Sequence, residues 1–360
     1  MHGCRCLKLE TRNSKPFRRN DLNSYAMSTF AIGVDLGGTN LRIAAVDERG
    51  AILERTALDT QASRGRDFVI TEMCEAIRAT VSKISSATLA GIGIGVPGII
   101  DMDTGMLRES PNLPGWHDYP VRDDIERRLG AKVILENDAN AAALGEQWLG
   151  AARDHDDMLM LTLGTGVGGG LVLGGHIWHG MRGMAGEPGH ITIDPDGPPC
   201  PCGNRGCLEQ FASATAIVRM AKESIAKGGS PGLERASKES GGLSAKSVYQ
   251  LAMQADEGAH QIYRRVGWAL GIGLAGLINL LNLPMYVIGG GVASGWDAFL
   301  PALLEEVRWR SFVYRATTGP GRKTIITRAL LGGDAGLFGA ARLPLLVPEV
   351  GGHEGVRKRA

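Results

Sequence analysis

The chain lacks a long apolar segment and carries almost no net charge. Its longest apolar run, residues 269–283, contains several glycines and is too short to span a bilayer, so we expect no membrane insertion. A formal net charge of +1 gives no indication of nucleic-acid binding. With 360 residues and 44% hydrophobic content, the chain can bury a sizeable core, and its length favours two domains over one.

The first 28 residues lack the apolar core that a secretion signal requires. They are basic, and they are too short and too irregular for a helix-turn-helix module. We expect residues 1–28 to form a disordered tail, and Met27, just before the first strand pattern, is a candidate alternative translation start. The missing export signal and a thiol-rich segment further along together favour the reducing cytoplasm.

Two familiar nucleotide-binding motifs are also missing. The chain has no GxxxxGK[ST], so a P-loop is not the mechanism of phosphate binding. The sequence GGGVAS, residues 289–294, follows an apolar strand but lacks the glycine spacing of the dinucleotide fingerprint. A nicotinamide-dependent dehydrogenase is therefore disfavoured.

Two glycine-rich hairpins are present instead. The first has strands at 30–34 and 41–46 around the turn DLGGTN, and the second has strands at 158–163 and 171–173 around the glycine turn 164–170. Gly37 and Gly164 are 164 − 37 = 127 residues apart. A repeat on this scale predicts duplicated α/β domains with a cleft between them.

The glycine turns leave backbone N–H groups free to approach an anion. A plain β-turn would explain either hairpin alone, but two in register favour a nucleotide whose phosphates lie between them. In the first turn Asp35 could hold Mg²⁺, directly or through water, while Thr39 and Asn40 offer polar groups to phosphate oxygens. The third glycine cluster, 289–291, would admit a flat group such as adenine.

Asn137 and Asp138 fall where a predicted strand, 132–135, gives way to an alanine-rich helix, 139–149. Both residue types are preferred helix N-caps, so one of them could simply satisfy free N–H groups. The other could face the cleft and accept a proton from a hydroxyl that attacks phosphorus. Position alone leaves both interpretations open.

One histidine and three cysteines fall at metal-ligand spacing between residues 190 and 207. His190, Cys200, Cys202 and Cys207 supply an imidazole and three thiolates, a set that suits a closed tetrahedral structural zinc. A disulfide between Cys200 and Cys202 would be strained, and pairing either with Cys207 would leave an odd thiol. An unmetallated thiol cluster is the main alternative.

Glu187, His190 and Glu209 flank this predicted zinc knuckle. A buried ion pair explains the first two without any ligand, and Glu209 could be an ordinary surface residue. A knuckle that begins at His190 would nevertheless fix the directions of all three, as a polyhydroxylated ligand requires. One ring nitrogen of His190 could bind zinc while the other donates to a hydroxyl.

Together these motifs resemble the ROK family of sugar kinases, and most closely its bacterial ATP-dependent glucokinases. The resemblance covers residues 30–341 and rests on DLGGTNLR, GVPG at residues 95–98, ENDANAA, LTLGTGVGGGLVL, GEPGH, CxCGxxGCLE and VIGGGVAS. It implies two α/β domains of RNase H type, as in the actin-like and hexokinase-like ATPases, with an interdomain cleft. We expect an N-terminal domain over 29–143, completed by a helix at about 330–345, and a C-terminal domain over 144–329 that contains the knuckle at 190–207.

The resemblance also implies a role for each matching residue. Asp138 matches the catalytic base, and the residues matching sugar ligands are Gly95, Asn137, Asp138, Glu187, His190 and Glu209. The residues matching the ATP and Mg²⁺ loops are Asp35, Gly37, Gly38, Thr39, Asn40, Gly164, Thr165, Gly166, Gly168, Gly289, Gly290 and Gly291. His190, Cys200, Cys202 and Cys207 match the family zinc site.

The reaction implied is transfer of phosphate from ATP to the 6-hydroxyl of glucose, by a cytoplasmic homodimer or homotetramer with no nucleic-acid or membrane partner. Pro188 departs from the aliphatic residue that many relatives carry in GEPGH, and proline fixes φ and removes an N–H donor. N-acetylmannosamine, N-acetylglucosamine, fructose and allose therefore remain alternative substrates. Further rivals are a sugar-responsive regulator, for whose DNA-binding domain this chain lacks room, a silent sugar sensor and an actin-like ATPase chaperone.

Overall fold

Each predicted glycine hairpin opens a five-stranded sheet. The computed structural model describes residues 28–110, 112–317 and 323–346. In the first sheet, with strand order β3-β2-β1-β4-β7, β1 pairs antiparallel with β2 and parallel with β4. Its strands are β1 Ser28–Leu36, β2 Asn40–Asp47, β3 Ile52–Asp59, β4 Ala87–Val96 and β7 Val133–Asn137.

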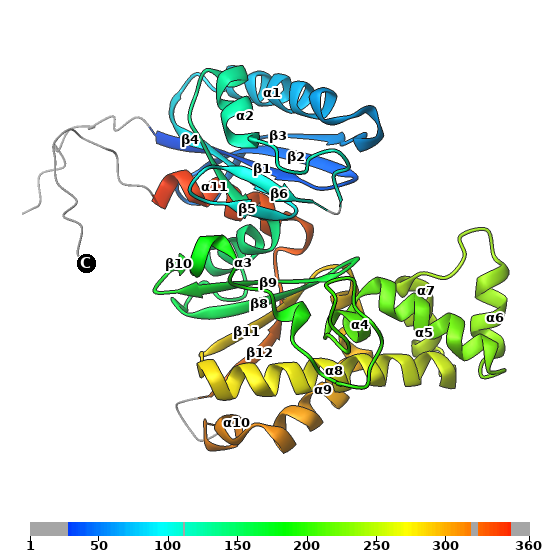
Figure 1. Cartoon of the computed structure of the whole chain (residues 1–360). Coiled ribbons are helices and arrows are strands. Elements are labelled where there is room, and N and C mark those ends of the chain that lie inside the picture. The colour runs from blue at the N-terminus through cyan, green and yellow to red at the C-terminus, as the bar shows by residue number, and fades with distance from the viewer. Residues whose placement is uncertain (1–27, 111, 318–322, 347–360) are drawn as a thin grey trace, which may run out of the picture.

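The second sheet repeats this topology. Its strand order is β10-β9-β8-β11-β12, with β8 antiparallel to β9 and parallel to β11. The strands are β8 Met158–Leu163, β9 Val167–Leu173, β10 His176–Ile177, β11 Met285–Gly289 and β12 Ile325–Arg328. Two sheets with one strand order confirm the predicted duplication and the two-domain α/β fold (Figure 1).

The N-terminal lobe buries one face of its sheet under α1, Arg66–Ser82, and α2, Val121–Leu129. In α1 the buried positions 69, 70, 73, 74 and 77 recur at helical spacing, so one stripe of the helix faces the strands. A short hairpin, β5 Ile99–Asp101 and β6 Met106–Glu109, projects from the end of β4.

The C-terminal lobe is built around α8, Glu257–Leu281, which takes in most of the apolar run 269–283. Gly267 and Gly271 let α9, Trp296–Arg310, approach closely, since a Cβ on either glycine would collide with the backbone of α9. The remaining helices are α4 Glu209–Ala212, α5 Ala214–Ala226, α6 Pro231–Lys238, α7 Ala245–Met253 and α10 Phe312–Thr317. Within the described ranges, no helix combines the length and apolarity needed to cross a membrane.

Two helices, α3 Asp138–Trp148 and α11 Ala335–Leu346, lie between the sheets (Figure 1). Gly145 and Gly339 allow their backbones to touch, because a Cβ on Gly339 would overlap the carbonyl oxygen of Ala141. The helix α11 also packs on β1 and β4. The boundary expected between residues 143 and 144 falls inside α3, which is continuous to Trp148.

A buried carboxylate connects the two chain passages between the lobes. The first passage leads from α3 to β8, and the second leads from β12 to α11. Glu146, on α3, is fully buried and accepts the backbone N–H of Ala151 in the first passage at 2.8 Å. It also accepts those of Leu330 at 3.1 Å and Leu331 at 2.7 Å in the second.

The second glycine turn is shorter than predicted. Strand β9 begins at Val167, so Gly168, Gly169 and Gly170 pair with β8 instead of forming a loop. The reason is packing: a Cβ on Gly168 would lie 3.1 Å from Ala139 Cβ, and one on Gly170 2.5 Å from Ala143 Cβ. These glycines make room for α3. The expected tail, residues 1–28, lies outside the described residues except for Ser28, where β1 begins.

Candidate active site

Asn137 caps the helix α3, which leaves the carboxyl group of Asp138 free of the capping role. Asn137 is the N-cap of α3, and its side-chain oxygen accepts the N–H groups of Ala139 at 2.9 Å and Asn140 at 3.2 Å. Asp138 is the first residue of the helix. The pKa of Asp138 is raised to about 6, first by burial and then by the negative charges of Asp35 and Glu187, while the backbone N–H of Ala139 opposes the rise. A carboxyl group with that pKa can exchange a proton near neutral pH.

Asp35 stands in β1 just before the first glycine turn. Burial raises its pKa, Arg42 at 3.4 Å opposes the rise, and the charge of Asp334 adds to it. The backbone N–H of Gly37 donates to Asn40 O at 2.8 Å and closes the turn. Gly38 and Thr39 lie between these two residues, at the partly exposed end of the hairpin. A carboxylate set among other carboxylates is suited to a hard cation such as Mg²⁺.

The second glycine turn, Gly164 to Gly166, is hydrogen-bonded to residues that follow the predicted zinc knuckle in the chain. Glu209, the first residue of α4, accepts the N–H of Val167 at 2.9 Å, just past the turn. Thr215 donates to the carbonyl of Thr165 at 2.8 Å. Glu209 is thus a structural support of the turn as well as a predicted ligand.

A cavity of about 550 Å³ opens beside this turn, large enough for a nucleoside. Of the third glycine cluster, only Gly291 lines it. Gly289 ends β11 against Met160, and Gly290, at φ 85°, lies against the backbone of Leu163. The other lining residues are Gly164, Thr165, Ala214, Ala245, Lys246, Tyr249, Gln250, Val292 and Ser294. The residues of α7 were missed by sequence analysis, because no motif marks them.

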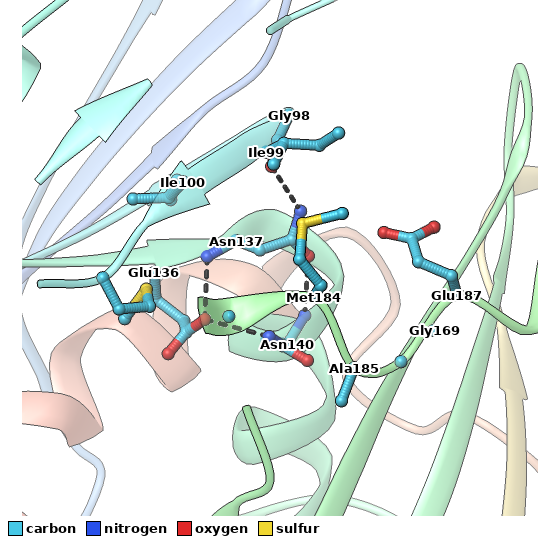
Figure 2. Close-up of a pocket in the computed structure, with 13 residues that line it drawn as sticks. Gly98, Ile99, Ile100, Glu136, Asn137, Asn140, Gly169, Met184, Ala185 and Glu187 are labelled. Atoms are coloured by element: carbon cyan, nitrogen blue, oxygen red, sulfur yellow. Dashed lines mark hydrogen bonds between the residues drawn. The ribbon is translucent and has the colours of Figure 1, made fainter. Parts of the chain in front are cut away.

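A second, narrower pocket of about 20 Å³ lies between the lobes (Figure 2). Its lining includes Asn137 and Glu187, together with Gly98, Ile99 and Met184. Asn137 donates its side-chain N–H to Gly98 O at 3.1 Å, which fixes the side chain in the pocket wall. Partial burial raises the pKa of Glu187, which His190 lowers and Glu209 raises.

Two residues singled out from the sequence do not face this pocket. Gly95 pairs with Asp35 and Glu136 in the sheet, and a Cβ there would lie in ordinary contact with Ala141 of α3, at 3.4 Å from its Cβ. Pro188 is buried, and its ring occupies the space where a Cβ on Gly169 would lie. The proline therefore fixes the loop against β9.

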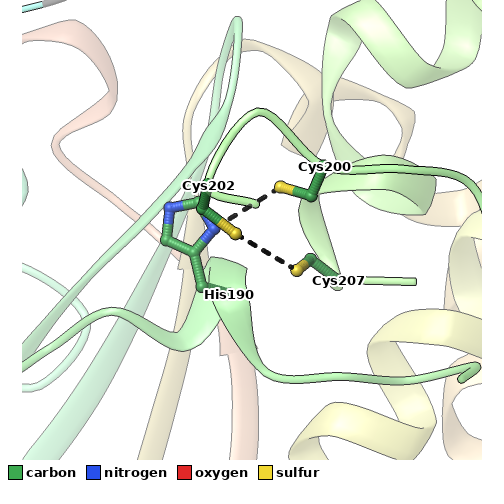
Figure 3. Close-up of side chains that lie close together, drawn as sticks. All are labelled: His190, Cys200, Cys202 and Cys207. Atoms are coloured by element: carbon green, nitrogen blue, oxygen red, sulfur yellow. Dashed lines mark hydrogen bonds between the residues drawn. The ribbon is translucent and has the colours of Figure 1, made fainter. Parts of the chain in front are cut away.

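The predicted metal ligands converge (Figure 3). One ligand atom from each of His190, Cys200, Cys202 and Cys207 lies within 4.8 Å of the others. His190 Nδ1 is 3.7 Å from Cys200 Sγ, and the sulfurs of Cys202 and Cys207 are 3.7 Å apart. Tetrahedral zinc at about 2.3 Å from sulfur and about 2.1 Å from nitrogen requires edges of roughly 3.6 to 3.8 Å. The donors and their spacing fit zinc, and the second ring nitrogen of His190 points away from the sulfurs.

Burial affects the cysteines of the knuckle unequally. Burial raises the pKa of Cys207 to about 12, and the neighbouring sulfurs of Cys200 and Cys202 contribute to the rise. Two tight backbone contacts shape the loop: Cys200 N–H donates to Asn204 O at 2.8 Å, and Gly206, at φ 62°, lies against Asp194 O. A bound metal would allow the thiolate form of all three cysteines.

Comparison with known proteins decides the family. The ROK family model matches residues 31–345, most of the chain. The chain belongs to the ROK family. A glucokinase from Thermotoga maritima is 41% identical to this ROK protein over 87% of the chain and 96% of its own length. A glucokinase from Halalkalibacterium halodurans is 39% identical over 87% of the chain and 94% of its own length.

Other ROK proteins resemble the chain in structure or have a different role. The crystal structure of a Streptomyces griseus glucokinase in complex with glucose and AMPPNP is 35% identical, with a TM-score of 0.71, and the match covers 87% of this chain and 98% of that one. A protein from Caldicellulosiruptor sp., described as a putative xylose repressor, is 35% identical over 78% of the chain but only 71% of its own length.

Proposed function

We propose that this protein is a glucokinase that transfers the γ-phosphoryl group of ATP to the 6-hydroxyl of glucose. The observation that carries the proposal is Asp138, a carboxyl group with a pKa of about 6 at a helix start between the lobes. Asn137, the residue before Asp138, lines the narrow pocket. The nucleoside-sized cavity opens beside the second glycine turn. The glucokinase relatives and the complex of one of them with glucose and AMPPNP support this assignment.

In the proposed reaction Asp138 accepts the proton of the 6-hydroxyl. The hydroxyl oxygen then bonds to the γ-phosphorus, the bond from that phosphorus to the bridging oxygen breaks, and ADP leaves. Asn137 and Glu187 hold the other hydroxyl groups of the sugar, with His190 and Glu209 behind them. Gly95, which pairs with Glu136 in the neighbouring strand, stays a predicted sugar-binding residue through its backbone.

The nucleotide lies across the cleft in this proposal. The adenosine occupies the cavity beside Gly291, and backbone N–H groups of the two glycine turns face the phosphates. The backbone of Gly37, Gly38, Thr39 and Asn40 forms the first turn, and that of Gly164, Thr165 and Gly166 forms the second, while Gly168, Gly289 and Gly290 serve the packing around them. Asp35 would hold Mg²⁺, which neutralises charge on the phosphates.

Zinc, held by His190, Cys200, Cys202 and Cys207, would supply rigidity and no chemistry. The ligand His190 follows Glu187 by one helical turn, and Glu209 follows Cys207 by two residues. A fixed knuckle therefore restricts the sugar-binding side chains on both flanks, in the way that outer-shell groups are fixed around metal sites.

One experiment tests the reaction and the sugar together. Purified protein is given Mg·ATP and, in turn, glucose, fructose, mannose, allose, N-acetylglucosamine and N-acetylmannosamine, and ADP release is followed with and without sugar. We expect glucose to have the highest kcat/KM. Selective turnover of another sugar would keep the mechanism and change the substrate, and sugar binding without turnover would favour a sensor.

Asp138→Asn is the matched variant for this assay. Because the amide cannot accept the hydroxyl proton, we expect kcat to fall about 10²- to 10⁴-fold. Glucose affinity, measured by calorimetry without ATP, should stay within a few-fold of the wild-type value. Substantial turnover by the variant would remove Asp138 from the role of base.

The resemblance further supports a homodimer or homotetramer in the cytoplasm. Light scattering of the purified protein measures the mass of the assembly directly. A monomer at micromolar concentration would contradict this part of the proposal.

A further inference from the structure

A buried carboxylate beside the narrow pocket organises three polar groups that the proposed mechanism does not use. Glu136, the residue before Asn137, is 1% exposed. Its Oε1 accepts the backbone N–H of Asn137 at 2.9 Å and the side-chain amide of Asn140 at 3.0 Å. Its Oε2 lies 2.7 Å from His179 Nε2, on the loop after β10 in the other lobe.

This arrangement fixes the orientation of the Asn140 side chain. The amide nitrogen must face Glu136, because the opposite rotamer would place two oxygens together at hydrogen-bond distance. The carbonyl oxygen, Oδ1, is then turned away from Glu136, as Figure 2 shows. A Cβ on Gly186 would lie 3.6 Å from this oxygen, so it faces the loop that forms the far wall of the pocket.

The Asn140 oxygen has no donor among the residues that the structure describes. The side chain is only 3% exposed, and Oδ1 is one of few buried side-chain atoms without a hydrogen-bond partner. Leaving a buried acceptor unpaired is unfavourable, so such an atom at a pocket wall indicates a ligand that brings the missing donor. A sugar hydroxyl is a donor of that kind.

We propose that Asn140 is an additional sugar-binding residue, whose Oδ1 accepts a hydrogen bond from a ring hydroxyl of the hexose, and that Glu136 and His179 are positioning residues that aim it. The proposal rests on the hexose kinase function above. The hydroxyl in question is not the 6-hydroxyl, which donates to Asp138. In this proposal Asn140 Oδ1 favours sugars that carry a hydroxyl group at the carbon facing it.

His179 completes the arrangement from the opposite lobe. The hydrogen bond with Glu136 raises the pKa of His179 and burial opposes the rise, with Glu136 as the charged group that faces the ring. The ring sits just before the loop of Gly183 to Glu187 that lines the pocket. Without it, Glu136 would lose one donor and the Asn140 amide would be freer to turn.

The test pairs a protein change with a sugar change. Asn140→Leu keeps the approximate size of the side chain and removes both the acceptor and the amide donor to Glu136. The variant is assayed with glucose and with its 1-, 2-, 3- and 4-deoxy analogues. We expect the KM for glucose to rise about three- to ten-fold with an unchanged KM for ATP. For one deoxy sugar the wild-type protein should show a similar loss, and Asn140→Leu should add little to it.

Three comparisons make the result decisive. Gln147→Leu, on the same helix, removes a hydrogen bond of 3.3 Å from the Gln147 side chain to His155 O. This bond does not involve the pocket, so the KM for the sugar should stay unchanged. His179→Leu should weaken discrimination against the same deoxy sugar, and His179→Gln, which keeps a donor for Glu136, should restore it. If Asn140→Leu does not fold, this pair carries the test.

An equal effect of Asn140→Leu on every sugar, or no effect, would overturn the proposal, since the oxygen would then be met by water or serve the fold alone. Calorimetric Kd values for the same sugars without ATP separate this result from the reaction. Glucose binding that depends on Asn140 in a protein without kinase activity would refute the proposed function and keep the binding role. Absence of sugar binding by the wild-type protein would overturn both.

Discussion

Asp138 shows how the surroundings of one carboxyl group prepare it for proton transfer. An isolated aspartic acid is ionised far below neutral pH and is a weak base. Here burial, together with the negative charges of Asp35 and Glu187, raises the pKa to about 6. A cation near Asp35 would partly cancel the second effect, so substrate binding and basicity are coupled at this residue.

A pH profile tests this pKa. Only the ionised form of Asp138 can accept a proton, so we expect kcat/KM for glucose at saturating Mg·ATP to fall on the acid side. The apparent pKa should lie above the ordinary aspartate value of about 4 and no higher than about 6, because the cation offsets part of the effect of Asp35. The folded protein holds this proton at higher pH than the unfolded chain does. The stability that Asp138 contributes is therefore present below about pH 4 and is lost as pH rises through about 6.

The measurement is a rate profile between pH 4.5 and 8.5, accompanied by thermal unfolding at each pH to confirm that the protein stays folded. An acid limb near pH 4 would mean that Asp138 is hydrated as freely as in a peptide. The burial argument would then be wrong for the protein in solution.

At the scale of elements, the knuckle and the glycine turns behave as rigid parts that flank the cleft. The turn at Gly164 is tied to α4 through Glu209 and Val167 at 2.9 Å, and α4 starts two residues after the ligand Cys207. A change in the knuckle should therefore alter sugar binding more than it alters the structure of the N-terminal lobe.

Cys202→Ser tests the knuckle. We expect zinc, measured by elemental analysis at about one per wild-type chain, to fall well below that level, since a serine hydroxyl is a poor zinc ligand. The KM for glucose should rise about ten-fold, as for loss of outer-shell support at a metal site. Cys74→Ser, at a buried cysteine of α1, is the matched control and should keep its zinc. Full activity of metal-free protein would contradict the supporting role.

The sequence predicts the elements well where local chemistry decides them. Glycine turns, a helix cap at Asn137 or Asp138 and a cluster of possible metal ligands are local patterns. The structure contains the turns and the cluster, and it assigns the cap to Asn137, a choice that the sequence left open. Gly168 to Gly170 were assigned to a loop because composition cannot distinguish a flexible glycine from one whose missing side chain makes room for α3 or, at Gly169, for Pro188. Asn140 and Tyr249 were missed because their places at the two pockets exist only after helices and sheets are assembled.

At the scale of the whole molecule, Glu146 is the point where the two inter-lobe passages meet. Its carboxylate accepts three backbone N–H groups, from Ala151, Leu330 and Leu331. Both passages between the lobes are therefore fixed to the same side chain.

Glu146→Gln should destabilise the protein by about 1 to 3 kcal/mol, since its amide group would place a donor against a backbone N–H in a fully buried site. Urea unfolding followed by circular dichroism measures the change. Glu223→Gln, in an exposed pair with Arg219, is the control and should change stability by less than about 1 kcal/mol. An unchanged midpoint for Glu146→Gln would show that the passages are held by other contacts.

The position of α11 has a consequence for biosynthesis. The helix packs on β1 and β4, where Gly33 and Gly93 meet its backbone, yet it is the last helix in the described chain. A ribosome therefore releases β1 to β7 long before the helix that covers their inner face has been made. The N-terminal lobe, translated first, can therefore complete its packing only after the C-terminal lobe has been synthesised.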